Sequence, residues 1–403
     1  MSTNTSKKIY IFVPGYYGST LKDQKSGRLI WGDTREIFFG RKTLAMPIPG
    51  LNVPGALDLQ AHNLIPDKKI LGGLLKEDAY DKTILFLNST DAEAVIPVPW
   101  DWRADPIKGI KKIDQVVMES KKKYPDHEFI LVSHSFGSLI STYYLRYGTQ
   151  DYFEAKENWE GLNHFSKIIL SGTPFRGSMA IFRNMLHGIK FGLNHNLQTS
   201  LAFSSFESSY YLIPARGFDL VLDENNNKVS LKLHDVETWI SNEYGLFSKK
   251  LKFNDETLMA RKEYVRLHLE RGVKLHELIE APVEKNPMDK KRILYLSGYG
   301  FKTTNSGVWL KNAKSPGTIL YFPKEFKKWK TSVSADIIYS DGDSTIAEFS
   351  LEMPIFLKVL KAEHVREKHS HLETLQSNSS HKVIYNFLTG KDLNHGTEKN
   401  PRN

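Results

Sequence analysis

An α/β fold with a mainly parallel sheet is the fold class that the sequence predicts, from three observations. Short β-rich runs alternate along the chain with amphipathic segments, and the spacing of Ile107, Ile110, Ile113 and Val117 is typical of a helix that packs on a sheet. One apolar run, at 129–132, ends abruptly in a serine-containing turn. Two long segments interrupt the alternation, so we expect them to form caps outside the sheet.

The strands are predicted where short apolar runs recur along the chain. In order, these runs lie at residues 9–13, 129–132, 168–170, 293–296, 335–339 and 354–360. A last helix is predicted at 383–388, beginning near Ser379 or Ser380 and ending at Gly390. A polar tail follows at 391–403.

A nucleophile elbow is predicted at Ser135. A strand that turns at once into a helix holds its serine in a strained backbone conformation, and only small residues two positions away on either side let the two arms approach. Ser133 and Gly137 occupy these positions, although the usual pattern has glycine at the first of them. Apolar residues then recur at helical spacing until Gly148, which is expected to end the helix. Ser135 is therefore the candidate nucleophile of an α/β-hydrolase fold, and a serine-rich strand end without chemistry is the alternative.

An oxyanion hole is expected beside this serine. Acyl transfer through a serine needs N–H donors for the oxyanion of the tetrahedral intermediate. In this kind of site one donor is the amide after the nucleophile, here Phe136, and the other comes from the loop after an early strand. The glycine-containing turn at 14–19 is such a loop; Tyr16 is the candidate donor and Tyr17 the alternative.

An orienting acid and then a histidine base are expected later in the chain, in that order. A polar turn supplies two aspartates, Asp341 and Asp343. A calcium site there is discounted because the remaining spaced ligands and the terminal glutamate of an EF-hand are missing. The polar loop before the last helix holds three histidines, and their spacing does not choose between them: His364, His369 and His371.

Ordered segments over nearly the whole chain resemble the lecithin:cholesterol acyltransferase family, which also contains lysosomal phospholipase A-type enzymes and phospholipid:diacylglycerol acyltransferases. The segments that carry the resemblance are VPGYYGS at 13–19, PVPWDWR at 97–103, SGTPFRGS at 171–178, SSYYLIP at 208–214, LSGYG at 296–300, DGDSTI at 341–346 and HLETLQSN at 371–378. The second of these resembles the family's PYDWR signature, which is rare elsewhere. Trp100, Trp102 and Arg103 within it are interpreted as core and cleft-wall residues, because arginine cannot act as a base at neutral pH.

The resemblance implies a role for each candidate residue. It makes Ser135 the nucleophile, Asp343 the orienting acid and His371 the general base, with Asp341 as the acid of the preceding turn. The resemblance also implies an α/β-hydrolase fold. No cofactor and no metal are expected.

The chain departs from the family's motifs at four positions without losing a catalytic group. These are Ser133 for Gly, Ser19 for Asn, Arg176 for Gly and Ser344 for Gly or Asp. Arg176 is expected to lie beside the strand end that borders the cleft and to alter head-group preference. The lid disulfide typical of secreted relatives is absent, since the chain has no cysteine.

A single α/β-hydrolase domain is expected to span residues 1–403, because one large sheet domain with insertions accounts for this length as well as two or three domains would. A first lid or cap insertion is expected at 22–82 and a second cap insertion at 179–291.

The charge of the chain favours contact with a polyanion. It carries 55 Lys and Arg against 46 Asp and Glu, a formal net charge of +9. Nucleic acid is not expected as a partner, because no recognisable nucleic-acid motif accompanies the charge. The basic stretch at 255–280 is interpreted as a solvated helix face in preference to a specific contact with anionic lipid.

Peripheral contact with an anionic membrane is expected at the first insertion. Its segment 46–75 is apolar and punctuated by Pro and Gly, and it is interpreted as a lid that docks on lipid through Leu71, Leu74 and Leu75. A buried insertion would have the same composition. No run reaches transmembrane length and no signal-peptide core is recognised, so a cytoplasmic or peripheral-membrane location is expected.

Taken with the resemblance, the residues predict a serine-dependent acyl hydrolase or O-acyltransferase. It would act on lipid esters, with a phospholipid as acyl donor, through an acyl-enzyme on Ser135. One alternative is a catalytically silent lipid- or membrane-binding protein on the same fold. Another is a basic nucleic-acid binder, whose binding would depend steeply on salt.

Overall fold

A six-stranded sheet, parallel throughout, forms the centre of the molecule. The computed structural model describes residues 7–65, 80–284, 287, 292–311, 313, 315–329 and 333–393. The strands follow the order β17-β12-β7-β6-β1-β5. Their bounds are β1 Lys8–Val13, β5 Ala92–Pro97, β6 Glu128–His134, β7 Lys167–Ser171, β12 Arg292–Gly298 and β17 Glu363–Glu367. The predicted α/β-hydrolase fold with its parallel sheet is confirmed.

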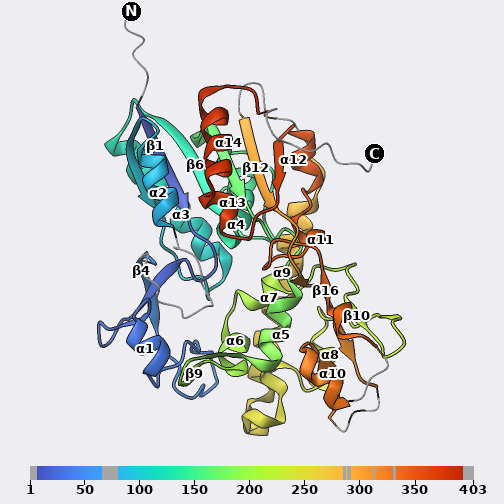
Figure 1. Cartoon of the computed structure of the whole chain (residues 1–403). Helices are drawn as coiled ribbons and strands as arrows, with labels where there is room; N and C mark the ends of the chain where they lie inside the picture. The colour runs from blue at the N-terminus through green and yellow to red at the C-terminus, as the bar shows by residue number, and fades with distance from the viewer. Residues whose placement is uncertain are drawn as a thin grey trace, which may run out of the picture.

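Two groups of helices cover the sheet (Figure 1). One group contains α3 Pro106–Lys123, α4 Phe136–Tyr147 and α12 Ile355–Val359; the other contains α2 Asp81–Asn88, α13 Glu373–Gln376 and α14 Asn378–Thr389. β6 is buried along both of its sides, so one group lies on each face, and the continuous apolar runs of the inner strands follow from this burial.

Capping residues set the ends of these helices as the sequence indicates. α3 begins after Asp105, whose side chain accepts the amide of Ile107, and its predicted apolar stripe is buried. α4 ends at Gly148 as predicted, with a φ of 61°. α14 begins slightly earlier than predicted, after the capping residue Ser377, and ends at Gly390.

Two of the predicted strands are wrong. The apolar run at 354–360 is the helix α12, because Pro354 provides its N-cap and the exposed Ile355 and Val359 recur at helical spacing. The last strand is instead β17, a polar edge strand that pairs only with β12. The run at 335–339 is a 3₁₀ turn capped by Ser334, followed by the short strand β16 Tyr339–Ser340.

The caps lie below the sheet in Figure 1 and come from three segments of the chain. The first segment contains β2 Ser19–Asp23, β3 Leu29–Trp31, α1 Thr34–Phe39 and β4 Leu59–Leu64. The second contains α5 Met179–His187, β8 Ile189–Phe191, β9 Asn194–Gln198, α6 Ser200–Ser205, α7 Ser209–Leu212, β10 Val221–Leu222, β11 Lys228–Val229, α8 Val236–Ser241 and α9 Leu258–Glu280. Single 3₁₀ turns lie at Leu162–His164, Gly245–Phe247, Lys249–Leu251, Asp255–Thr257 and Ala335–Ile338.

The third cap segment was not predicted from the sequence. It contains β13 Thr303–Thr304, β14 Gly307–Trp309, β15 Ile319–Leu320, α10 Pro323–Trp329 and β16. β14 pairs in parallel with β10, so the second and third segments share a four-stranded sheet of order β11-β10-β14-β15. Its strands have only two or three residues, too few to show a periodic pattern.

In the described part of the first insertion, the segment around Met46 is packed, whereas Phe39 is exposed. Met46 and Ile48 are buried, and the Met46 amide donates to the Ser205 hydroxyl over 2.8 Å. The predicted docking residues Leu71, Leu74 and Leu75 lie outside the described residues. Within the described part of the chain, no helix has both the length and the apolar character needed to cross a membrane.

The basic helix α9 is not simply a solvated face, so that interpretation is wrong in part. Arg261 is buried, and Arg271 is largely enclosed. Only part of the expectation holds: Arg266 is exposed and pairs with Glu263 and Glu270 on its own helix. The enclosed cations therefore have a structural use.

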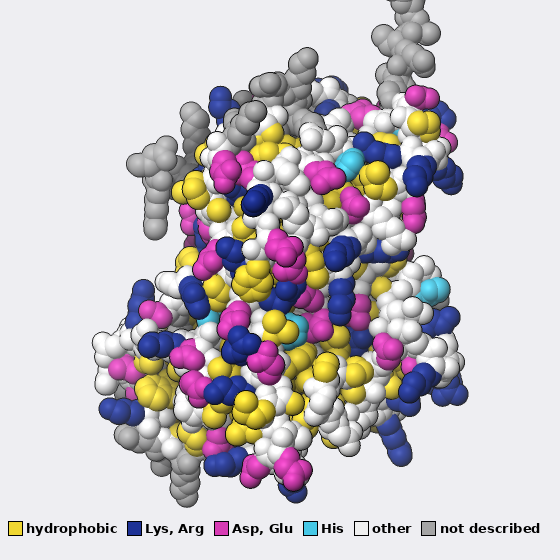
Figure 2. Space-filling model, turned by 180° about the vertical axis from the view of Figure 1, so that it is seen from behind, with side chains coloured by type: hydrophobic (Ala, Val, Ile, Leu, Met, Phe, Trp, Pro, Cys, Tyr) yellow, Lys and Arg dark blue, Asp and Glu magenta, His cyan; other side chains and the backbone are white. Residues whose placement is uncertain are grey.

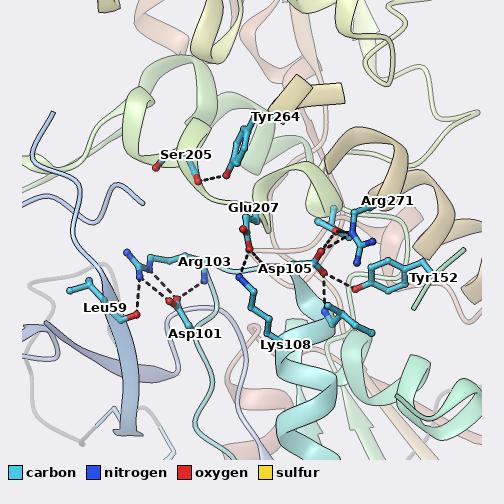
Figure 3. A network of polar contacts seen from close by, with 12 residues as sticks. Leu59, Asp101, Arg103, Asp105, Lys108, Tyr152, Ser205, Glu207, Tyr264 and Arg271 are labelled. Atoms are coloured by element: carbon cyan, nitrogen blue, oxygen red, sulfur yellow. Dashed lines mark hydrogen bonds and ion pairs between the residues drawn. The ribbon is translucent and has the colours of Figure 1, made fainter. Parts of the chain in front are cut away.

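Arg271 ties the cap helix α9 to the start of α3 (Figure 3). Its guanidinium lies 2.7 Å from the Asp105 carboxylate and 2.8 Å from that of Asp151. Asp105 also accepts the hydroxyls of Tyr211 at 2.6 Å and Tyr152 at 3.2 Å while capping α3. Breaking such an enclosed pair leaves an uncompensated charge.

Arg271→Met should therefore lower the free energy of unfolding by about 3 kcal/mol, because Asp105 loses its cation inside the fold. Arg266→Met on the same helix is the matched control and should change the unfolding temperature little, since surface pairs contribute little. Thermal unfolding followed by circular dichroism measures both. Equal shifts in the two variants would contradict the anchoring role of Arg271.

Candidate functional site

Ser135 occupies the strained turn that the sequence predicts. It stands between β6 and α4 with φ 55° and ψ −126°, a conformation costly for a residue with a side chain. Its amide donates to the Ser171 carbonyl over 2.7 Å. A Cβ on Gly137 would lie 2.4 Å from the Pro14 carbonyl oxygen, so β1 and the elbow can approach only because this residue is glycine.

Serine replaces the usual glycine at position 133 without disturbing the elbow. The Ser133 hydroxyl is buried and reaches the Ile169 carbonyl at 3.4 Å. Ser138 on α4 donates to the Ser133 hydroxyl over 3.1 Å. The extra polar group therefore has partners, as a buried hydroxyl requires.

The loop after β1 lies directly against the nucleophile. A Cβ on Gly15 would lie 2.7 Å from the Ser135 Cβ, and Tyr17 has a positive φ of 66°. In the described part of the chain, no backbone carbonyl accepts the amides of Tyr16, Tyr17 or Phe136. These amides are the candidate oxyanion donors from the sequence, and the geometry leaves all three available.

The tryptophans of the 97–103 signature hold this loop in place. The Trp100 indole donates to the Pro14 carbonyl over 3.0 Å, and the Trp102 indole donates to the Ser19 carbonyl over 3.1 Å. The Ser19 hydroxyl accepts the Trp100 amide over 3.1 Å. Both indoles are buried, as the sequence predicts, but their use as clamps on the loop was not foreseen.

Arg103 extends the clamp to the first cap segment. Its guanidinium bonds Asp101 at 2.8 and 3.0 Å (Figure 3). It also donates to the Leu44 carbonyl over 2.8 Å. The side chain is buried, so this pair with its extra acceptor is a fixed part of the fold. The signature thus joins the loop beside Ser135 to the cap.

Of the two candidate acids, only Asp343 contacts a histidine. Its Oδ2 lies 2.6 Å from Nδ1 of His371, and the residue is 0% exposed. Its Oδ1 accepts the amides of Thr345 at 3.0 Å and Ile346 at 2.7 Å. Asp341 instead accepts the amide of Gly300, at 2.6 Å, in the neighbouring turn.

The three candidate histidines lie in different surroundings. His364 is on β17, where Nε2 lies 2.8 Å from the Ser297 hydroxyl, and burial lowers its pKa to about 4. His369 contacts the Ser379 hydroxyl at 3.0 Å. Of the three, only His371 lines the cavity that contains Ser135.

A fourth histidine, His134, was missed although it directly precedes the nucleophile. The Gly15 amide donates to the Tyr80 hydroxyl over 3.0 Å, and this hydroxyl lies 3.0 Å from Nδ1 of His134. The Nε2 atom lies 3.0 Å from the His371 carbonyl, which can only accept, so Nε2 carries the hydrogen. Burial, and then repulsion by His371, lowers the pKa of His134 to about 3, which keeps the ring neutral. This series of hydrogen bonds connects the loop beside Ser135 with the backbone of His371.

A cavity of about 520 Å³ opens beside Ser135 and His371. Its wall is mainly apolar and aromatic, and the residues that supply this character are Tyr16, Tyr17, Ile65, Tyr80, Phe136, Pro174, Ala180, Ile181, Ile189, Leu212, Ile346 and Leu372. Such a lining suits an acyl chain. Among the described residues, no cluster of His, Asp and Glu is arranged to hold a metal ion.

Arg176 does not line this cavity, contrary to the expectation from its position. Its guanidinium pairs with Glu280 at 2.9 Å and donates to the Phe349 carbonyl over 2.8 Å. A direct effect on head-group preference is therefore not supported.

Comparisons of sequence and structure relate the chain to known proteins. Residues 87–356 match the family model of lecithin:cholesterol acyltransferase. A phospholipid–sterol O-acyltransferase of Arabidopsis thaliana is 29% identical over 132 residues, which cover 31% of this chain and 20% of that protein. The match thus spans only about a fifth of that relative. The solved structure of the Tle4–Tli4 complex contains a chain with a TM-score of 0.58 and 13% identity, covering 96% of this chain and 99% of that one, which shows a shared fold.

Acid should destabilise the protein through its buried neutral histidines. The pKa of His364 falls from 6.5 to about 4 on folding, so between these values the unfolded chain binds a proton that the folded chain does not. Stability is therefore present above pH 6.5 and is lost as the pH falls toward 4, by about 3 kcal/mol for this residue. Unfolding temperatures measured across this range should fall less steeply for His364→Gln than for the unmodified chain. If the unfolding temperature fell equally steeply with pH in both proteins, His364 would not be a source of the acid sensitivity.

Proposed function

The chain belongs to the lecithin:cholesterol acyltransferase family, and we propose that it is a serine-dependent acyl hydrolase or O-acyltransferase of lipid esters, with a phospholipid as acyl donor. The hydrogen bond between His371 and the fully buried Asp343, beside the cavity that contains Ser135, is the observation that carries the proposal. A silent lipid-binding protein would have no use for this pair or for the strain at Ser135.

In the proposed reaction, Ser135 Oγ attacks the ester carbonyl while His371 Nε2 takes its proton. Asp343 accepts the Nδ1 hydrogen and stabilises the imidazolium. The amides of Phe136 and Tyr16 donate to the oxyanion, with Tyr17 as the alternative second donor. The proton on His371 passes to the leaving alcohol, which leaves an acyl group on Ser135. Water or another hydroxyl, deprotonated by His371, then takes the acyl group.

Ser135→Ala and His371→Ala should each lower kcat by about 10⁴-fold or more, because the first removes the nucleophile and the second removes the general base of the proposed reaction. The buried His364 and the Ser379-bound His369 provide matched controls, and their alanine variants should keep most activity. Hydrolysis of p-nitrophenyl butyrate and labelling by a fluorophosphonate measure the effects. Loss on His369→Ala without loss on His371→Ala would overturn the choice of base.

Asp343→Asn should impair turnover far more than Asp341→Asn in the same assay, since only the first carboxylate contacts the imidazole.

We further propose that the tip formed by Phe39 and Leu193 contacts the lipid surface. These side chains are 68% and 72% exposed, and the Leu193 amide donates to the Phe38 carbonyl over 2.9 Å, which joins the β8–β9 hairpin to α1. Arg41 and Lys42 are exposed beside them. Ile189 at the base of the same hairpin lines the cavity, so the hairpin connects the tip to the cavity wall.

The distribution of charged side chains favours contact with anionic lipid at one site on the surface, and not over the whole face. Figure 2 shows Lys and Arg side chains interspersed with Asp and Glu over the face seen there, without one continuous basic surface. On that face the charges are mixed, so the proposed contact at the tip relies on apolar insertion, with Arg41 and Lys42 beside it.

Leu193→Asp should reduce hydrolysis of phospholipid vesicles by about tenfold and leave p-nitrophenyl butyrate hydrolysis unchanged, because it removes apolar insertion without touching the cavity. Met259→Asp is the control, since Met259 on α9 is also 72% exposed. Vesicle flotation measures binding directly. A parallel loss on both substrates, or the same loss for the control, would contradict docking by this tip.

A further inference from the structure

Arg183 is a cation in the wall of the cavity that contains Ser135. It lies on α5, the helix that follows the SGTPFRGS segment. Its guanidinium donates to the Thr304 hydroxyl over 3.2 Å and to the side-chain oxygen of Asn184 over 3.2 Å. The ring of Phe322 lies under it, with the centroid 5.6 Å away. These contacts fix the position of the guanidinium.

Within the described residues, no carboxylate pairs with Arg183. Its titratable neighbours include His187 on the same helix and the hydroxyls of Tyr17, Tyr321 and Tyr339, and burial lowers the pKa of Arg183. Four other arginines with little exposure each have a carboxylate partner; the pairs are Arg103–Asp101, Arg146–Glu157, Arg176–Glu280 and Arg271–Asp105. A fifth arginine, Arg261, is buried and also has no carboxylate partner among the described residues, but it donates to the Leu246 carbonyl over 3.1 Å and lies outside the cavity. Arg183 therefore differs from all five in presenting an unpaired charge to the cavity.

An unpaired cation in a mainly apolar wall, at a partly buried position, favours the binding of an anion. Removing a charge from water costs free energy unless an opposite charge replaces the lost solvation. Thr304 and Asn184 are neutral acceptors, so they orient the guanidinium without cancelling its charge. A phosphate group matches the planar fork of an arginine and binds it with strong, charge-assisted hydrogen bonds.

We propose that Arg183 binds the phosphodiester of the acyl donor, so that the cavity selects phosphate-bearing lipid esters over neutral ones. This inference rests on the proposed function, because it places the scissile ester at Ser135. The apolar wall then takes the acyl chain and Arg183 takes the charged group of the same molecule. Both groups line one cavity, so a single lipid reaches them together.

Arg183→Gln tests the proposal with two short-chain substrates that do not need a membrane. The kcat/KM for diheptanoylphosphatidylcholine should fall by about 10- to 100-fold, mainly through KM, because a charge-assisted contact is lost. The kcat/KM for the neutral diheptanoylglycerol should stay within about twofold. Arg216→Gln, at an exposed arginine outside this cavity, should leave both values unchanged.

A binding measurement separates recognition from turnover. Hexadecylphosphocholine, a phosphodiester lipid without an ester bond, should inhibit p-nitrophenyl butyrate hydrolysis more strongly in the unmodified protein than in Arg183→Gln. Octyl glucoside, which has no charge, should inhibit both equally. Should Arg183→Gln fail to fold, Arg183→Lys keeps the charge but not the fork, and a selective loss on the phosphatidylcholine is expected for it too.

Equal losses on the charged and neutral substrates, or no loss on the charged one, would overturn the proposal. These results differ from a failure of the proposed function, in which the unmodified protein would hydrolyse none of the three esters.

Discussion

The rest of the site depends on the backbone turn at Ser135. A residue with a side chain is held there at positive φ, at a cost of about 1–3 kcal/mol that the surrounding structure has to offset. The parallel sheet does so by bonding the Ser135 amide to the end of β7, and Gly137 lets the end of β1 approach. The same packing brings the loop after β1 against the serine. The turn therefore requires β1 and β7 on either side of β6, and this arrangement brings the polar loops together beside the serine.

Several residues of the family motifs hold loops in place through hydrogen bonds and do not take part in the proposed chemistry. The indoles of Trp100 and Trp102 bond the loop beside Ser135, and Arg103 carries the connection into the first cap segment. The neutral His134 continues this network toward the backbone of His371 through a hydrogen bond to its carbonyl. Because every member has a partner, the network can hold the loops rigidly in a low-dielectric interior. The signature at 97–103 is therefore needed for the position of the loop beside Ser135, and not for a chemical step.

Much of the fold could be predicted because buried parallel strands are continuous apolar runs and helix ends carry capping residues. The edge strand β17 has no such run, since only Val365 of its five residues is buried. The helix α12 was predicted as a strand because its apolar run is too short to show a helical period. Site residues such as Ser135 could be predicted because they lie in local motifs whose order along the chain is typical of the fold. Neither Tyr80 nor Arg183 has a local signal, because tertiary packing alone brings them to the cavity.

The residues around the cavity come from widely separated parts of the chain. Ser135 precedes its proposed partners Asp343 and His371 by more than half of the sequence, and both partners follow β12, which joins the sheet beside β7. A chain grows from its N-terminus, so β1, β5, β6 and β7 leave the ribosome with the serine long before the acid and the base. With the proposed roles, a half-made chain carries an inert serine. With these roles, the proposed ester cleavage could begin only after the last strand has joined the sheet.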